Sequence, residues 1–92
     1  MKKVEGEKSD HEVLIYTLST CMWCKKTKRF LEENSVEFQF EDVDLLSGDE
    51  RERVVDALEK YNPAVSFPTV VVDGEEVVVG FNETGLKGVL GR

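Results

Sequence analysis

Residues 13–33 read VLIYTLSTCMWCKKTKRFLEE, in which an apolar run, a pair of cysteines and a helical pattern follow one another directly. The run from Val13 to Leu18 has no polar alternation, which predicts a strand that is covered on both faces in the centre of a sheet. Cys21 and Cys24 are the only cysteines of the chain. A Cys-x-x-Cys pair that follows a strand and opens a helix is typical of a redox motif in an intracellular protein.

The helical pattern after the first cysteine makes the two thiols unequal. Cys24, Thr27 and Leu31 stand at positions i, i+3 and i+7, so this stripe is expected to face the core. Cys21 stands instead at the start of the helix, where backbone N–H groups without a helical partner favour a thiolate. We therefore predict that Cys21 is the nucleophile of thiol–disulfide exchange and that Cys24 is the resolving thiol.

Four basic residues follow the pair on the same helix. Lys25 and Lys26 lie within about one turn of Cys21, and their charges are expected to stabilise its thiolate. Together with Lys28 and Arg29 they form either an ordinary solvated helix face or a basic patch that steers an acidic partner to the thiol. In the second case, turnover of the partner should fall as ionic strength rises.

The totals indicate one small domain in the cytoplasm. The chain has 92 residues, of which 40% are hydrophobic and 34% are charged, and its net charge is −7. This acidic balance argues against nucleic acid or an anionic membrane as a partner. No apolar stretch reaches the roughly 20 residues of a membrane span, and the first residues are too charged for a signal peptide. We expect a flexible tail over residues 1–11, with a solvated His11, and a single domain over residues 12–92.

The remaining segments alternate between strand and helix patterns. They are, in order, a strand at 36–41, a helix at 47–61, a hairpin of 69–72 and 77–79 around Asp73-Gly74, and a short helix after Asn82. The strand at 36–41 has one wet face, which suggests the edge of a sheet. The order β-α-β-α-β-β-α predicts an α/β fold with a four-stranded mixed sheet and three helices, in which a right-handed crossover joins the first two strands.

Several residues admit two interpretations from the sequence alone. Cys21, Cys24 and His11 supply too few ligands for a closed zinc site, so a metal would need a dimer that shares its cysteines, or an iron–sulfur cluster completed by external thiols. Pro68 either starts a strand or is a cis-proline packed opposite the cysteine pair. Trp23 is either a partly exposed docking surface or a core residue, and its place inside the motif favours exposure.

The layout resembles the glutaredoxin family. The resemblance covers about residues 12–91 and is carried by Tyr16-Thr17, Cys21-Met22-Trp23-Cys24, Phe67-Pro68-Thr69 and Gly80-Phe81. It implies a thioredoxin-like fold, a cis peptide bond at Pro68, and a redox-active disulfide between Cys21 and Cys24 with no other cofactor and no metal. It also implies partner contacts at seven residues of the last three stretches: Met22, Trp23, Phe67, Pro68, Thr69, Gly80 and Phe81.

Departures from the glutathione-using members of this family indicate a subgroup. Those members usually have Pro-Tyr between the cysteines, a lysine three residues before the first cysteine, and a Gly-Gly pair near the C-terminus. This chain has Met22-Trp23, Leu18 and Gly80-Phe81 at these places. A cation and a close-approach glycine that would hold glutathione are therefore missing.

The stretch Cys-x-x-Cys-x-x-Thr-Lys-Arg at residues 21–29, together with Gly-Phe, is similar to the NrdH-type redoxins. This resemblance implies a monomeric electron carrier that reduces protein disulfides, such as that of ribonucleotide reductase, and that a reductase of the thioredoxin reductase type reduces in turn. The Pro-Asp that usually follows Gly-Phe in that group and its usual Gln inside the motif are absent here. The alternatives are a glutathione-dependent glutaredoxin and a dimeric zinc or iron–sulfur carrier that uses Cys21 and Cys24.

Overall fold

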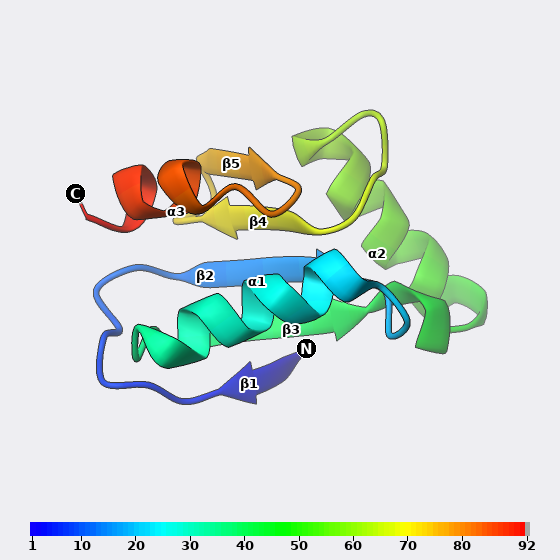
Figure 1. The fold of residues 1–92 in the computed structure, drawn as a ribbon. Coiled ribbons are helices and arrows are strands. Elements are labelled where there is room, and N and C mark those ends of the chain that lie inside the picture. The colour runs from blue at the N-terminus through cyan, green and yellow to red at the C-terminus, as the bar shows by residue number, and fades with distance from the viewer. Residues whose placement is uncertain (92) are drawn as a thin grey trace.

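The computed structural model describes residues 1–91 and places three helices around a five-stranded sheet (Figure 1). The strands are β1 (Lys2–Val4), β2 (Val13–Thr17), β3 (Phe38–Asp42), β4 (Thr69–Val72) and β5 (Glu76–Val79). The helices are α1 (Met22–Glu33), α2 (Gly48–Tyr61) and α3 (Glu83–Leu90), and a short 3-10 helix, η1 (Val43–Leu45), precedes α2. This is the predicted order of elements with one strand added before it.

The central strand of the sheet is β2, and the strand order is β1-β3-β2-β4-β5. It runs parallel to β3 and antiparallel to β4, so that Ile15 pairs with Phe40 on one side and with Val70 on the other. Side chains on both faces of β2 are buried, as the absence of alternation predicts. The hairpin of β4 and β5 turns at Asp73 and Gly74, and both of these residues have positive φ.

Helices cover both faces of the sheet and form two cores. On one face, α1 and α3 pack against the sheet around Ile15, Leu31 and Leu86, which are fully buried (Figure 1). On the other face, α2 packs against the sheet through a cluster that contains Leu58 and Val71. Across residues 1–91, no helix has both the length and the apolar character that crossing a bilayer requires. β2 ends at Thr17 and α1 begins at Met22, so a short loop joins the central strand to the first turn of this helix.

The additional strand, β1, corrects both the predicted four-stranded sheet and the predicted flexible tail. It pairs antiparallel with β3, so β3 is an inner strand rather than the expected edge. Lys8, which follows β1, forms a separate parallel bridge with Val36: its N–H donates to the Ser35 carbonyl, and its carbonyl accepts from the N–H of Glu37, each at 2.9 Å. The pairing uses backbone atoms, and the polar side chains of residues 1–11 carry no apolar alternation that would reveal it.

The segment between β1 and β2 is held at two further points. A Cβ atom on Gly6 would lie 2.6 Å from the carbonyl oxygen of Ser35, so the close approach of the two backbones accommodates only glycine. His11, which was expected to be solvated, has its Nδ1 2.6 Å from Oδ2 of Asp73. The N–H of Glu12 donates to the other oxygen of the Asp73 carboxylate at 2.8 Å. The N-terminal segment therefore bridges β3 and the turn of the β4–β5 hairpin.

Candidate active site

Cys21 caps the amino-terminal end of α1, after the loop that leaves β2. Its backbone is extended (φ −80°, ψ 118°), and its Sγ accepts a hydrogen bond of 3.2 Å from the N–H of Cys24. The Cys21 side chain is partly exposed, and both thiols are free in this structure. The Cys24 N–H and the amino-terminal end of α1, which is the positive end of the helix dipole, therefore lie next to this sulfur.

Cys24 lies on the inward stripe of α1, as predicted. It is fully buried, as are Thr27 and Leu31 on the same face of the helix. Burial, and secondarily a hydrogen bond with Cys21, raise the pKa of the Cys24 thiol to about 12. A partly exposed sulfur and a buried, protonated thiol therefore stand next to each other.

The basic residues of α1 point in different directions. Lys25 and Lys26 are exposed, and Nζ of Lys26 lies 4.6 Å from the centre of the Trp23 ring, which is a cation–π contact. Lys28 is less exposed and pairs with Asp42 at 3.3 Å. The basic residues are thus not one uniform solvated face. That Lys25 and Lys26 stabilise a thiolate at Cys21 stays a prediction.

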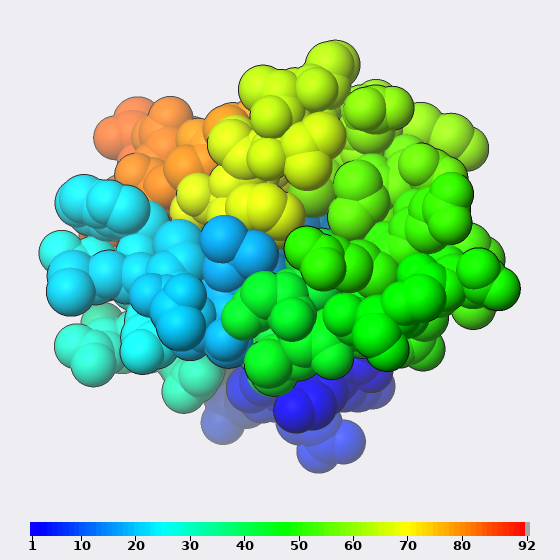
Figure 2. All heavy atoms as spheres, turned by 90° about the vertical axis from the view of Figure 1, so that its right-hand side faces the viewer, coloured from blue at the N-terminus to red at the C-terminus, as the bar shows by residue number. Residues whose placement is uncertain are grey.

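The loop that precedes β4 adjoins the start of α1 on one face of the molecule, where the two segments appear in yellow and in blue to cyan (Figure 2). The peptide bond between Phe67 and Pro68 is cis, as the resemblance implies. The hydroxyl of Thr69 donates to the Ser66 carbonyl at 2.8 Å and accepts from the Asn62 side chain at 3.0 Å. Among the expected contact residues of this loop, Pro68 and Thr69 have buried side chains and Phe67 is half-buried.

Trp23 and Phe81 join the cysteine motif to the segment after β5. Their rings stack with centroids 6.3 Å apart and planes at 21°, and Phe81 also meets Phe30 in an edge contact at 6.2 Å. Trp23 is 55% exposed and Met22 is 69% exposed, so Trp23 is a surface residue rather than a core residue. Sequence reasoning missed Val79, which is 50% exposed. The unbroken valine run at the end of β5 has no polar alternation, so the sequence carries no signal for this exposure.

Gly80 connects the Pro68 loop to this aromatic pair. Its φ of +76° lies in the left-handed region, which glycine adopts without strain. Its N–H donates to the Pro68 carbonyl at 2.8 Å. The next residue is Phe81, so the structure brings together the cysteine motif, the Pro68 loop and the Gly-Phe pair.

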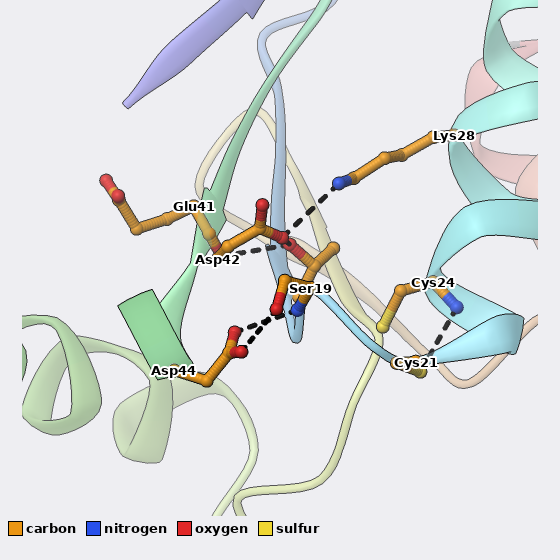
Figure 3. A network of polar contacts seen from close by, with 8 residues as sticks. Ser19, Cys21, Cys24, Lys28, Glu41, Asp42 and Asp44 are labelled. Carbon is orange, nitrogen blue, oxygen red and sulfur yellow. Dashed lines mark hydrogen bonds and ion pairs between the residues drawn. The ribbon is translucent and has the colours of Figure 1, made fainter. Parts of the chain in front are cut away.

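An unpredicted polar network lies where β2 and β3 end (Figure 3). The hydroxyl of Thr17 donates to Oδ1 of Asp42 at 2.6 Å, and the Lys28 ammonium contacts the same oxygen. Asp44 accepts hydrogen bonds from the hydroxyl and the N–H of Ser19, which hold the pKa of the Asp44 carboxyl below its ordinary value. Two aspartates directly after a predicted strand are the only sequence signal for this network.

The cysteine pair offers two sulfur ligands. Among residues 1–91, no three His, Cys, Asp or Glu side chains come together in a way that could hold a metal ion. A zinc or iron–sulfur centre on Cys21 and Cys24 would therefore need ligands from outside this part of the chain.

The fold and the cysteine pair together define a class of protein. A mixed sheet between helices, with Cys-x-x-Cys at the start of the helix after the central strand, is the predicted thioredoxin-like fold. The family model of glutaredoxin matches residues 13–77 of the chain. The chain belongs to the glutaredoxin family.

Similar proteins agree with this assignment. A glutaredoxin-like 8.6 kDa protein in the rubredoxin operon of Clostridium pasteurianum is 34% identical over 79 residues, which are 85% of this chain and 96% of that protein. The glutaredoxin structure from Methanosarcina mazei Go1 has 42% identity and a TM-score of 0.91, over 99% of this chain and 87% of that one. The structure of Methanosarcina acetivorans methanoredoxin has 41% identity and a TM-score of 0.83, over 88% and 85%. The NrdH-type subgroup stays a prediction.

Proposed function

We propose that this protein is a dithiol thiol–disulfide oxidoreductase that reduces the disulfides of other proteins. One observation carries the proposal: the partly exposed sulfur of Cys21 accepts a backbone hydrogen bond at a helix start, while Cys24 beside it is buried and protonated. Such a pair provides an accessible nucleophile and an internal thiol that acts second. The two thiols supply both electrons, so the chemistry needs no bound cofactor.

The reaction consists of two exchanges. In the first, the Cys21 thiolate attacks one sulfur of the partner disulfide, and the other partner sulfur leaves with the electron pair and takes a proton from solvent. In the second, Cys24 loses its proton to solvent and attacks Sγ of Cys21, which releases the remaining partner sulfur as a thiolate. The chain then holds a Cys21–Cys24 disulfide, and the partner has gained two electrons.

The electron donor that we propose is a flavoprotein reductase of the thioredoxin reductase type, and the acceptor is a protein disulfide such as that of ribonucleotide reductase. Glutathione is a small charged tripeptide, whose binding calls for cations and open backbone near the thiol. Leu18 brings no charge to this place, and the ring of Phe81 stacks on Trp23 where other members have a second glycine. Exposed Met22 and Trp23 offer instead the apolar and aromatic surface that protein interfaces favour.

Trp23 fluorescence tests the proposal, because this residue lies between the cysteines and is the only tryptophan. Oxidised protein is mixed with NADPH and a thioredoxin reductase, or with glutathione, and the signal follows reduction of the disulfide. We expect fast reduction by the reductase alone. Fast reduction by glutathione alone would replace the proposed donor and make the protein a glutathione-dependent glutaredoxin. A protein that neither system reduces would contradict the proposed donor.

A further inference from the structure

Lys28 lies one helical turn after Cys24 on α1, and its side chain extends toward the end of β3 (Figure 3). Its Nζ lies 3.3 Å from Oδ1 of Asp42 and 3.8 Å from the centre of the Phe40 ring. Only 20% of the Lys28 side chain and 15% of the Asp42 side chain are exposed. Charges that are this far removed from water act on their surroundings more strongly than charges in solvent do.

Asp42 is itself held in place. The fully buried Thr17 donates its hydroxyl to Oδ1 of Asp42 at 2.6 Å, and the parallel pairing of β2 and β3 sets these two residues opposite each other. A chain of contacts therefore runs from the central strand through Asp42 to Lys28. It keeps the Lys28 ammonium near the inner side of α1, on which Cys24 also lies (Figure 3).

The burial of Cys24 disfavours the loss of its proton, and the positive charge of Lys28 can reduce this effect. Cys24 must lose its proton before it attacks Cys21, but burial raises the pKa of the Cys24 thiol and so disfavours the thiolate. The positive charge of Lys28 acts on the Cys24 pKa in the opposite direction from burial. The ionisable groups on the surrounding elements are the Cys21 thiol at the helix start, Glu41 and Asp42 at the end of β3, and Asp44 in η1 (Figure 3). Lys25, Lys26 and Arg29 lie on the exposed side of α1.

We propose that Lys28 is a positioning residue for the resolving step: held inward by Asp42, its ammonium stabilises the Cys24 thiolate as this thiolate forms. The inference rests on the proposed function. In the step, the Cys24 proton passes to solvent, a bond forms between the sulfurs of Cys24 and Cys21, and the bond from Cys21 to the partner sulfur breaks. The electron pair of that bond leaves with the partner. Lys28 neither gives nor takes a proton.

An aromatic disulfide that releases the coloured thionitrobenzoate anion separates the two exchanges in time. Reduced protein releases one equivalent when Cys21 reacts, and a second equivalent when Cys24 displaces the group bound to Cys21. We expect Lys28→Gln to preserve the first phase and to slow the second by roughly three- to tenfold. The slowing should persist throughout the pH range in which the second phase accelerates with pH. Lys28→Arg should retain most of the rate, because it keeps the charge.

Arg29→Gln is the matched control, since it removes a positive charge from an exposed position next to Lys28 on the same helix. It should spare the second phase. An equally fast second phase in Lys28→Gln and in the unsubstituted protein would overturn the inference. Equal slowing by Lys28→Gln and Lys28→Arg would also overturn it, because the effect would then come from packing against Phe40. Release of only one equivalent by the unsubstituted protein would instead refute the proposed function, since Cys24 would not resolve.

Discussion

Trp23 stacks against Phe81 with ring centroids 6.3 Å apart, and this contact joins the interior of the cysteine motif to the residue after Gly80. Trp23 lies in the first turn of α1, and Phe81 lies between β5 and α3, so the two rings come from segments that are distant in the sequence. An aromatic pair contributes roughly 0.5–1.5 kcal/mol beyond the area that it buries. Phe81 therefore restricts the orientation of Trp23 on the surface that a partner protein would contact.

Replacing Phe81 by alanine should weaken docking of the partner. Loss of the stacked pair corresponds to roughly a two- to tenfold fall in kcat/KM for reduction by the donor protein, mainly through a higher KM. Steady-state kinetics with the reductase and NADPH measure this effect. Phe81→Tyr keeps the ring and should retain the parent value. Equal kcat/KM for the alanine and tyrosine variants would show that the stack does not support docking.

The two cysteines should respond differently to substitution by serine. Cys21→Ser should abolish turnover, because it removes the accessible sulfur at the start of α1. Cys24→Ser should leave a stable mixed disulfide between Cys21 and the partner, because the resolving thiol is gone. Mass spectrometry under non-reducing conditions detects this adduct. Turnover by Cys21→Ser at the parent rate would reverse the assignment of the two roles.

The reduced protein should lose stability at alkaline pH relative to the oxidised protein. The pKa of Cys24 is about 12 in the folded chain, compared with an ordinary value of 9.0. Folding thus favours the protonated thiol, so the stabilisation is complete below pH 9 and is lost as pH rises toward 12. The difference in unfolding free energy should change by at most about 1.4 kcal/mol per pH unit, because one proton is involved.

Denaturant unfolding of both redox forms between about pH 8 and pH 11 measures this difference. Groups such as Tyr16 titrate in both redox forms, so their contributions to the difference in unfolding free energy largely cancel. The reduced Cys24→Ser variant is the control, since its serine does not titrate in this range. A pH-independent difference between the reduced and oxidised parent proteins would contradict the shifted pKa of Cys24.

The contact between His11 and Asp73 should contribute to stability in mild acid. The hydrogen bond from His11, followed by that from the N–H of Glu12, lowers the pKa of the Asp73 carboxyl below its ordinary value of 3.8. The ionised carboxylate is therefore favoured by folding, and its stabilising effect is present above that value and is lost as pH falls below it. Thermal unfolding scans from about pH 6 to pH 3 should show a shallower fall in Tm for Asp73→Asn.

Asparagine suits this comparison because Asp73 has φ of +55°, a conformation that asparagine tolerates. The substitution removes the titrating group and keeps the turn. Identical acid profiles for the parent and the variant would mean that the His11–Asp73 contact does not stabilise the fold.

Local sequence patterns were sufficient to predict most of the fold. The unbroken apolar run of β2 indicated a central strand, and the short helix expected after Asn82 begins there, where the Asn82 side chain accepts from the N–H of Gly85 at 2.9 Å. β1 was missed because it is joined to β3 by backbone hydrogen bonds and contributes one apolar side chain, Val4. Backbone pairing of polar residues has no periodic signature.

The candidate site likewise has features that local sequence patterns predict and features that they do not. The difference between Cys21 and Cys24 follows from helical periodicity, so it could be predicted before the structure. The network of Thr17, Lys28 and Asp42 could not, because it depends on the register between two parallel strands and on the direction of one lysine side chain. Contacts between distant segments require the tertiary structure.

The placement of β1 has a consequence for how molecules of this protein meet in solution. Without β1, the outer strand on this side would be β3, and its free N–H and C=O groups could recruit another molecule. β1 covers β3 with three residues, and two of them, Lys2 and Lys3, are exposed. A strand added at this edge would find only three residues to pair with and two lysine side chains in its path, and short edge strands that carry lysine disfavour lateral growth of a sheet.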